Sequence, residues 1–452
     1  MKIIVVGCGK IGTALIESLV AEGHDVVAID KSPAVLENIT NVYDVMAACG
    51  NGTDWDLLVE VQAETADLLI AVTDSDELNM LCCFLAKRLG TKHTVPRIRN
   101  PEHNDGSLDF LRQQLELSLV INPERMVAKE LYHMLRLPSA ARVETFSGRG
   151  LEMVELKLEP DSPLDGKSLI DLRKKYPFNF LVGMVEREEE VFIPDGNFRL
   201  MSGDKISIVA TPAERLKLLK SLDLLQKQAR NIMILGASST AYYLTRMLLN
   251  AGCSVKVVDK SEEQCRSFSE EIPEAVVIHG DGARQELLLE EGLSGMDAFV
   301  ALTGLVEQNI LVSYFAAGQN VPKVISKINR DEFFAMAEQL GLDSVVSPRK
   351  TVSNVLVRYA RALENSLESS METLYKLVNG KAEALEFTVH EDSTVCNIPL
   401  KNLQLKSNIL IAGITRNRKS MIPTGNDVIC ANDKVLILAA GHRINNLSDM
   451  LE

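Results

Sequence analysis

The chain repeats itself once, and this repeat limits its fold more than any other feature of the sequence. The segment Ile3–Gly12 aligns with Ile232–Ala241 at an offset of 229 residues. Asp30 and Asp259 keep the same offset. Internal similarity at a constant spacing is typical of a duplicated structural unit. A chain of 452 residues with this pattern is expected to fold as two equivalent halves.

Each half begins with short apolar runs that alternate with helical segments. In the first half these runs are Ile3–Val6, Val26–Ile29, Leu68–Val72 and Leu119–Ile121. Apolar, β-branched runs separated by helices are typical of a parallel sheet that is covered on both faces. We therefore predict an α/β protein with two Rossmann-type, doubly wound parallel sheets.

The pattern changes near residue 140. Met153–Leu158 alternates apolar and polar residues, and Leu385–Val389 repeats this alternation in the second half. Alternation predicts half-buried strands, so we expect a small α+β module after each Rossmann domain. The predicted organisation is a first Rossmann domain at 1–122, a connecting helix at 123–140, a first small module at 141–225, a second Rossmann domain at 226–347, a second connecting helix at 348–370 and a second small module at 371–452.

Charge and hydropathy limit the partners of the chain. There are 48 basic and 62 acidic residues, which disfavours nucleic acid because its binding depends on phosphate neutralisation by Lys and Arg. Apolar runs such as Val435–Ala440 are far shorter than the about 20 residues that span a bilayer. The apolar run after Lys2 is too short for a signal peptide. We therefore expect a cytoplasmic protein with reduced thiols, in which Cys8 and Cys49 are buried, and the His and Cys spacings predict no zinc site.

A glycine-rich loop follows the first predicted strand and opens a helix. In such a loop the first glycine allows a tight turn, the second leaves room for a pyrophosphate and the third lets the helix pack closely on the strand. The free amides at the start of the helix then face the anion. This context predicts a dinucleotide site whose loop consists of Gly7, Cys8, Gly9, Lys10, Ile11 and Gly12.

Residues at the ends of later strands extend the predicted site. Asp30 lies 18 residues beyond Gly12, where its carboxylate can accept both ribose hydroxyls. A 2′-phosphate would meet like charge there, so we expect NAD or NADH rather than NADP. Lys10 and Lys31 either touch phosphate or are solvated, and we favour solvation. The remaining candidate contacts in this half are Lys31, Gly52, Thr53 and Thr73.

The second copy of the loop departs from the dinucleotide pattern. Ser238 stands at the position of the second glycine, and its side chain would occupy the space of the pyrophosphate. Asp259 remains at the end of the following predicted strand and is kept as a candidate contact. The second site is therefore expected to be weaker, altered or vacant.

Catalytic motifs are scarce in the sequence. It contains neither a Gly-x-Ser-x-Gly elbow nor a phosphate-binding loop for hydrolysing nucleoside triphosphates, and no tyrosine is followed by lysine four positions later. These features favour a binding protein without catalytic residues. The alternatives are an NAD-dependent oxidoreductase with duplicated Rossmann domains and an adenylate sensor that has no membrane partner.

The duplicated Rossmann domain and three runs in the small module carry a family resemblance. These runs are Ser162–Leu169, Ile193–Gly196 and Gly203–Lys205. Over essentially the whole chain the sequence resembles the bacterial Trk potassium-uptake regulators, which contain two KTN (RCK) domains. The resemblance implies nucleotide contacts by the loop glycines, Asp30 and the Gly52–Thr53 loop.

The resemblance also implies a function and partners. It implies a regulatory, non-enzymatic subunit that binds NAD(H), or alternatively ATP or ADP. Such a subunit would associate with itself into a ring of Rossmann domains, as a dimer or tetramer. It would lie on the inner face of the cell membrane through a Trk-type potassium channel or transporter. The resemblance places Glu124 near the nucleotide, whereas the second copy has Arg349 at the corresponding position.

Overall fold

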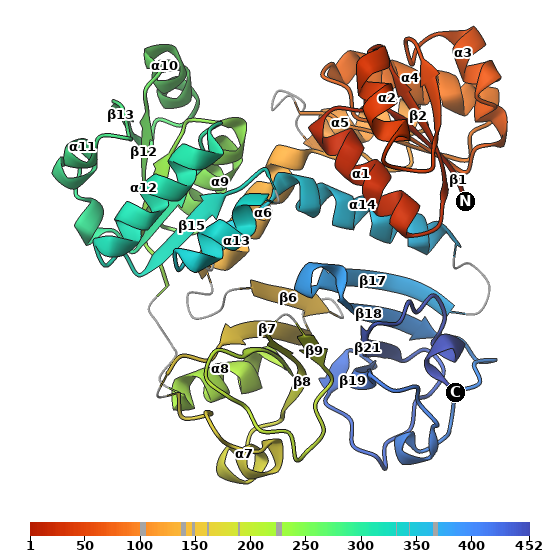
Figure 1. The fold of residues 1–452 in the computed structure, drawn as a ribbon, viewed down its shortest axis with the longest axis vertical. Coiled ribbons are helices and arrows are strands. Elements are labelled where there is room, and N and C mark those ends of the chain that lie inside the picture. The colour runs from red at the N-terminus through yellow and green to blue at the C-terminus, as the bar shows by residue number, and fades with distance from the viewer. Residues whose placement is uncertain are drawn as a thin grey trace. The chain divides into compact units, whose positions relative to one another are not determined.

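The computed structural model divides into two units, each built from corresponding segments of the two halves (Figure 1). Unit 1 contains Met1–Tyr132 and Ala229–Val357, and unit 2 contains His133–Gln228 and Arg358–Glu452. The structure describes residues 1–99, 105–136, 142–146, 150–160, 162–188, 190–222, 228–330, 332–342, 344–364 and 369–452. The domain boundaries predicted at 140/141 and 225/226 lie outside the described residues.

The first Rossmann domain of unit 1 is a five-stranded parallel sheet in the order β3-β2-β1-β4-β5. On β1, Ile4 pairs with Val27 of β2 and with Leu69 of β4. The strand order reverses beside β1, which opens a crevice at the carboxyl ends of these strands. The strands are β1 (Lys2–Val6), β2 (Asp25–Asp30), β3 (Met46–Cys49), β4 (Leu68–Ala71) and β5 (His93–Pro96).

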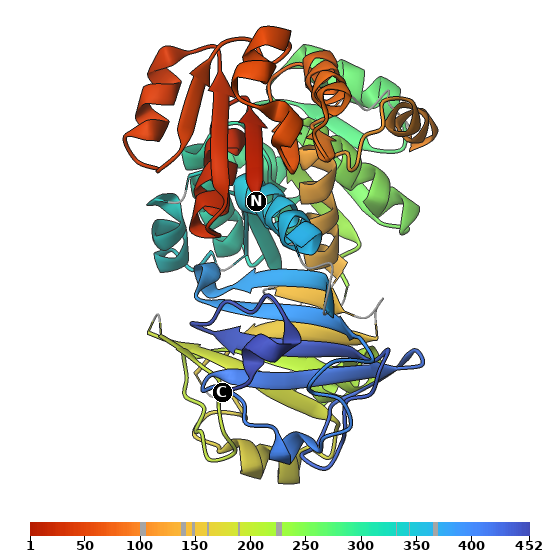
Figure 2. The same ribbon diagram turned by 90° about the vertical axis from the view of Figure 1, so that its right-hand side faces the viewer.

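Helices cover both faces of this sheet (Figures 1 and 2). The apolar stripe of α1 buries Leu15, Ile16 and Leu19, because residues three and four apart share one helical face. The helices are α1 (Lys10–Ala21), α2 (Pro33–Thr40), α3 (Trp55–Glu60), η1 (Ala63–Thr65), α4 (Asp76–Leu89), α5 (Asp105–Gln114) and α6 (Pro123–Arg136).

Two details of the first sheet differ from the sequence predictions. Leu119–Ile121 does not form a strand, since only Ile121 makes a single bridge, to Arg97 beside β5. Cys49 is exposed rather than buried, because β3 is an edge strand and is covered poorly. Burial of a short apolar run depends on its position in the sheet, which the run itself does not encode.

The second Rossmann domain repeats the first with one added strand. Its sheet has the order β13-β12-β11-β14-β15-β16, and β16 pairs with β15 at the place where the first domain makes one bridge. The strands are β11 (Asn231–Leu235), β12 (Ser254–Asp259), β13 (Val276–His279), β14 (Ala298–Ala301), β15 (Lys323–Lys327) and β16 (Val345–Val346). The helices are α9 (Ser239–Asn250), α10 (Glu262–Glu271), α11 (Gln285–Glu290), η3 (Leu293–Gly295), α12 (Val306–Gly318), α13 (Glu332–Gln339) and α14 (Pro348–Glu364).

Unit 2 contains two antiparallel five-stranded sheets, in the orders β6-β7-β10-β8-β9 and β17-β18-β21-β19-β20. The first small module comprises β6 (Arg142–Phe146), β7 (Leu151–Lys157), α7 (Leu169–Lys175), β8 (Phe180–Arg187), β9 (Glu190–Phe192), β10 (Lys205–Ala210) and α8 (Pro212–Ser221). The second comprises β17 (Ser369–Leu377), η4 (Val378–Gly380), β18 (Ala382–Val389), η5 (Leu400–Asn402), β19 (Ile409–Arg416), β20 (Lys419–Met421), β21 (Lys434–Ala440) and η6 (Leu447–Met450).

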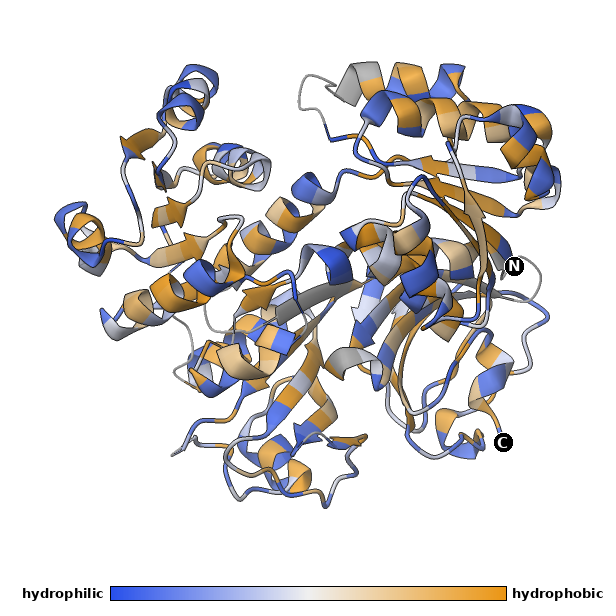
Figure 3. Cartoon of the chain, turned by 45° about the horizontal axis from the view of Figure 1, so that its top comes forward, coloured by the Kyte–Doolittle hydropathy of each residue, from blue (hydrophilic) through white to orange (hydrophobic). Residues whose placement is uncertain are grey.

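The two small modules share one apolar core. Met153 and Met184 of the first module pack in the same buried cluster as Ala384 and Leu438 of the second. Hydrophobic residues are concentrated on the strands, whereas the helices mix both kinds (Figure 3). Burial of apolar surface between the sheets therefore holds the duplicated modules together.

The second connecting helix is shorter than the predicted 348–370. Helix α14 ends at Glu364, and β17 begins at Ser369 and pairs with β18 along its length. In the last turn of α14, Arg361 is fully buried and makes two hydrogen bonds to Glu383 of β18, at 3.0 and 2.7 Å. This ion pair fixes the end of the helix to the second small module.

Candidate functional site

A cavity of about 370 Å³ lies at the carboxyl edge of the first Rossmann sheet. Its walls come from the loop after β1, the end of β2, the loop after β3 and the loop after β4. Six of the residues predicted from the sequence line it, namely Gly7, Gly9, Asp30, Lys31, Gly52 and Thr73. The lining also includes Gly50, Asn51, Asp74, Ser75 and Leu78, which were not among the predicted contacts.

The three glycines of the first loop have different roles. Gly7 has a φ of +92°, and a Cβ there would lie 2.8 Å from the Thr73 nitrogen. A Cβ on Gly12 would lie 1.9 Å from the Gly7 carbonyl oxygen, so α1 packs directly on the loop. Around Gly9, no described atom lies within 4 Å of an added Cβ. The first and third glycines therefore build the turn, and the second leaves open space at the cavity.

The start of α1 offers unpaired amides at this cavity. Gly9 is the N-cap residue, and among the described residues no side chain accepts a hydrogen bond from the first turn. The first backbone bond of the helix runs from the Thr13 amide to the Gly9 carbonyl, at 2.9 Å. The preceding amides, together with the helix dipole, make this end of the helix suited to an anion.

Asp30 holds the glycine loop against the end of β2. Its Oδ2 accepts a hydrogen bond from the Cys8 amide at 2.7 Å, and its Oδ1 accepts one from the Ser32 amide at 2.9 Å. A carboxylate has about four acceptor positions, so each oxygen can still accept a hydroxyl. Asp30 is therefore a structural clamp as well as a cavity residue, a role that sequence reasoning did not identify.

Asn79 is a second residue that sequence reasoning missed. Its side chain is fully buried and accepts hydrogen bonds from the amide and hydroxyl of Thr73, at 2.8 and 2.7 Å. Asn309 makes the same pair of bonds to Thr303 in the second domain, at 3.0 and 2.6 Å. The shared offset of 230 residues was the signal that could have revealed this asparagine.

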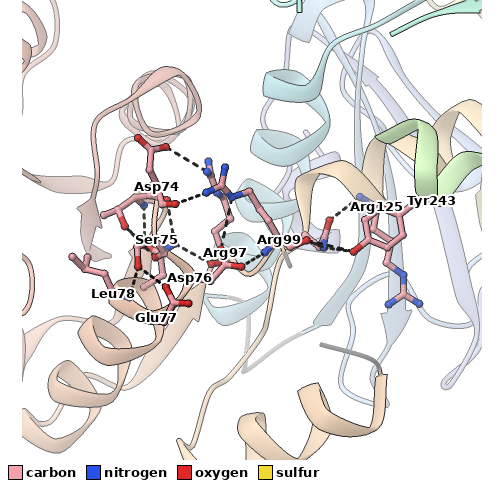
Figure 4. A network of polar contacts seen from close by, with 12 residues as sticks. Asp74, Ser75, Asp76, Glu77, Leu78, Arg97, Arg99, Arg125 and Tyr243 are labelled. Carbon is pink, nitrogen blue, oxygen red and sulfur yellow. Dashed lines mark hydrogen bonds and ion pairs between the residues drawn. The ribbon is translucent and has the colours of Figure 1, made fainter. Parts of the chain in front are cut away.

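Two arginines lie beside the cavity wall that Asp74 forms (Figure 4). The Arg97 guanidinium is 3.6 Å from the Asp74 carboxylate, and Arg99 donates to the Asp74 carbonyl oxygen. Burial, reinforced by the nearby Arg99 charge, lowers the pKa of Arg97. The Arg99 amide also donates to Asp76 at 2.8 Å. Positive charge is thus held at the cavity edge by carboxylates and carbonyl groups.

The other predicted contacts do not line the cavity. Cys8 is buried beneath the turn, and burial together with the Asp30 charge raises the pKa of its thiol to about 12, so it stays protonated. Lys10 is exposed, Ile11 is half-buried, and the Thr53 amide is bonded to its neighbour Asn51 at 3.3 Å. The remaining two are Gly12, which packs beneath the loop, and Asp259, which belongs to the second domain.

In the second glycine loop Asp259 makes the same contact as Asp30, but a serine side chain caps the start of α9. The Asp259 carboxylate accepts a hydrogen bond from the Ala237 amide at 2.7 Å, as Asp30 does from Cys8. The Ser238 hydroxyl accepts a hydrogen bond from the Ala241 amide at 3.4 Å and so caps α9. One amide that would face an anion is therefore occupied by the protein itself.

Two tandem Rossmann domains, each followed by a small antiparallel module, define the class of the protein. It has the architecture of a duplicated Rossmann fold with attached accessory modules. The TrkA-N domain model matches residues 3–123 and 232–348, and the TrkA-C domain model matches residues 153–223 and 384–452. The chain belongs to the TrkA family of Trk system potassium uptake proteins.

Full-length relatives support this assignment. The chain is 30% identical over 450 residues to the Trk system potassium uptake protein TrkA homolog of Archaeoglobus fulgidus, with 100% of both chains covered. It is 29% identical over 443 residues to the Trk system potassium uptake protein TrkA of Vibrio alginolyticus, covering 97% of this chain and 95% of the relative.

Solved structures share the fold at low sequence identity. The GsuK RCK domain matches with a TM-score of 0.62 and 16% identity, covering 97% of this chain and 92% of that one. The GsuK channel bound to NAD also matches with a TM-score of 0.62 and 16% identity, covering 97% and 76%. These matches confirm the predicted fold class of Rossmann-type sheets with small modules.

Two kinds of feature are absent from the residues that the structure describes. In the part of the chain that the structure describes, no helix combines the length and apolar character needed to cross a bilayer. Within the same residues, no three His, Cys, Asp or Glu side chains are grouped so that they could bind a metal ion.

Proposed function

We propose that the protein is a nucleotide-sensing regulatory subunit of a Trk-type potassium uptake system. In this proposal NAD(H), or alternatively ATP or ADP, binds in the cavity of the first Rossmann domain. The chain associates with itself through its Rossmann domains and lies on the cytoplasmic face of the membrane through the potassium-conducting subunit. Binding then changes potassium flux without any bond being broken.

The open space at Gly9 is the observation that carries the proposal. It adjoins the unpaired amides at the start of α1, and it lies in the same cavity as the Asp30 carboxylate. An adenine nucleotide needs an anion site for its phosphates and a hydrogen-bond acceptor for its ribose. Within this proposal Gly7 and Gly9 flank the phosphates, and Gly52 and Thr73 form the opposite wall.

Relatives of the same fold support the ligand class. The GsuK channel has been solved bound to NAD and bound to ADP. Both ligands contain an adenosine diphosphate group, which is the part that a glycine loop and a strand-end acid recognise. Selectivity between NAD(H) and the adenine mononucleotides therefore depends on contacts to the parts of the ligand outside the shared adenosine diphosphate.

A ligand can regulate flux only if it binds two arrangements of the protein unequally. Allosteric couplings are typically about 1–3 kcal/mol, so a modest difference in affinity is sufficient. The proposed mechanism requires that the occupied and empty cavities favour different arrangements of the Rossmann domains.

Calorimetry on the full chain tests the ligand assignment. NAD, NADH, ATP and ADP are titrated separately into the wild type and into the Gly9→Val variant. We expect saturable binding of at least one nucleotide by the wild type and none by the variant. Absence of binding for all four, or unchanged binding by Gly9→Val, would refute the proposed site.

A flux assay tests the regulatory part. The chain is added to vesicles that contain its potassium-conducting subunit, with and without the nucleotide that binds. We expect flux to change with nucleotide and with no turnover of NADH. Consumption of NADH with a carbonyl or hydroxyl substrate would instead support the oxidoreductase alternative.

A further inference from the structure

We propose that Tyr243 of the second Rossmann domain reports the occupancy of the first-domain cavity to the second domain. This inference rests on the proposed function, because it requires a nucleotide in that cavity. It assigns to the second domain the role of reading a site that lies in the first.

Tyr243 reaches from α9 to the first domain (Figure 4). Its hydroxyl donates a hydrogen bond to the Arg99 carbonyl oxygen at 3.4 Å and accepts one from the Asn122 side-chain amide at 3.1 Å. The same Asn122 amide group donates to the Arg99 carbonyl oxygen at 3.3 Å. Burial raises the pKa of Tyr243, which keeps the hydroxyl protonated and able to donate.

Arg99 connects this contact to the cavity wall. Its guanidinium donates to the carbonyl oxygen of Asp74, which lines the cavity. Its backbone amide donates to the buried carboxylate of Asp76, at the start of α4. The path from the cavity to the second domain is therefore short: Asp74 contacts Arg99, and Arg99 contacts Tyr243.

Phosphate charge in the cavity would act directly on this path. The Asp74 carboxylate is fully exposed and 3.6 Å from the Arg97 guanidinium. A bound diphosphate repels Asp74 and attracts the neighbouring guanidinium groups, because opposite charges within a few ångströms attract strongly near a protein surface. Movement of Arg99 then changes the length and angle of the hydrogen bond from the Tyr243 hydroxyl to the Arg99 carbonyl oxygen.

Only the second domain has a tyrosine at this position of the repeat. The repeat offset of 229 places Ala14 at the position that corresponds to Tyr243. A methyl group cannot form the reciprocal hydrogen bond from the first domain to the second. The second loop also caps its own helix through Ser238. The two halves are therefore specialised, one to hold the ligand and the other to respond to it.

Hydrogen exchange on the full chain tests the inference, with Tyr243→Phe compared with Tyr242→Phe. Phe keeps the ring and removes only the hydroxyl. Tyr242 is a matched control because its hydroxyl is bonded to Arg246 at 2.9 Å, on its own helix. Exchange in α9 is measured without nucleotide and with saturating NADH, ATP or ADP, whichever binds the wild type in calorimetry.

In the wild type and in Tyr242→Phe we expect nucleotide to change the exchange rate of α9. In Tyr243→Phe that change should shrink by about fivefold, the effect of losing one neutral hydrogen bond, while the nucleotide Kd stays within about twofold.

The outcomes separate the two proposals. If the wild type binds nucleotide and Tyr243→Phe retains the full exchange response, the role of Tyr243 is wrong and the proposed function stands. If the wild type binds no nucleotide, both proposals are wrong. A loss of affinity in Tyr243→Phe equal to its loss of response would make Tyr243 a part of the binding site rather than a reporter, and would also overturn the inference.

Discussion

The Asp30 carboxylate accepts a hydrogen bond from the Cys8 amide at 2.7 Å, and this contact ties the glycine loop to the neighbouring strand. Asp259 and Ala237 make the same contact at 2.7 Å in the second domain, where the loop has lost its second glycine. The acid is therefore retained in a copy with a closed helix start. Because both loops make this contact, the structural role of the acid and its proposed contact with nucleotide can be separated by experiment.

We predict that Asp30→Ala weakens NADH binding by about 1.5–3 kcal/mol, the range for removing a charged hydrogen-bond partner. Asp259→Ala is the matched control, since it removes the same two backbone contacts from the second domain. Both variants should lose similar stability in thermal unfolding, but only Asp30→Ala should lose affinity in calorimetry. Equal NADH affinities would show that Asp30 only supports the loop.

We predict opposite effects for substitutions at two neighbouring glycines. Gly9→Val should fold normally, because the residue has a φ of −68° and an added Cβ meets open space, but it should abolish nucleotide binding. Gly12→Ala should destabilise the first domain by about 1–3 kcal/mol or more, because its Cβ would clash with the Gly7 carbonyl. Melting temperatures and calorimetry distinguish the two effects. A poorly folded Gly9→Val would contradict the first expectation.

We predict a pH dependence of stability from Lys323, which is buried at the start of β15. Burial lowers the pKa of Lys323 from 10.5 to about 8. Between these values the unfolded chain holds the proton and the folded chain does not. The free energy of unfolding therefore rises with pH across this window, by at most about 1.4 kcal/mol per pH unit for this group.

Lys323→Met should remove that contribution, because it keeps the volume without the charge. Urea unfolding between pH 8 and 10 should show a shallower rise for the variant than for the wild type. The remaining slope should come in part from Lys327, whose pKa burial also lowers to about 8. Parallel pH profiles for the two proteins would refute the contribution of Lys323.

We predict that the buried pair Arg361 and Glu383 stabilises unit 2 only when both partners are present. Arg361→Met alone should cost about 3–5 kcal/mol, because it leaves a buried carboxylate without its partner. Adding Glu383→Leu should recover most of this loss, since a well-packed apolar pair replaces the ions. Denaturant unfolding of the single and double variants gives the coupling energy. Additive losses would mean that the pair has no mutual interaction.

Features that depend on neighbours along the chain could be predicted from the sequence. The glycine loop requires Gly7 and Gly12 because of its backbone conformation and close packing, and the spacing of the glycines predicts this requirement. Alternation in Met153–Leu158 reports a half-buried strand in the same way. The strand alternation recurs in the second half at Leu385–Val389, whereas the second loop keeps only the first glycine, Gly236.

Contacts between distant segments could not be derived in this way. Leu119–Ile121 has the composition of a strand but makes one bridge, and Cys49 is exposed because β3 is at the sheet edge. The clamp from Asp30 to Cys8 joins residues 22 positions apart, so the pattern suggested only a ribose contact. Each of these features depends on which helices, strands and loops are neighbours in the folded protein.

The sequence by itself determined the duplicated architecture and the glycine loop that lines the cavity, because both are encoded in short-range patterns and their repetition. Only the tertiary structure decided that Arg99 bonds both to Asp74 in the cavity wall and to Tyr243 of the other Rossmann domain. Arg99 and Tyr243 lie 144 positions apart in the chain. Their contact arises from the packing of two complete domains, and no local preference of either residue encodes it.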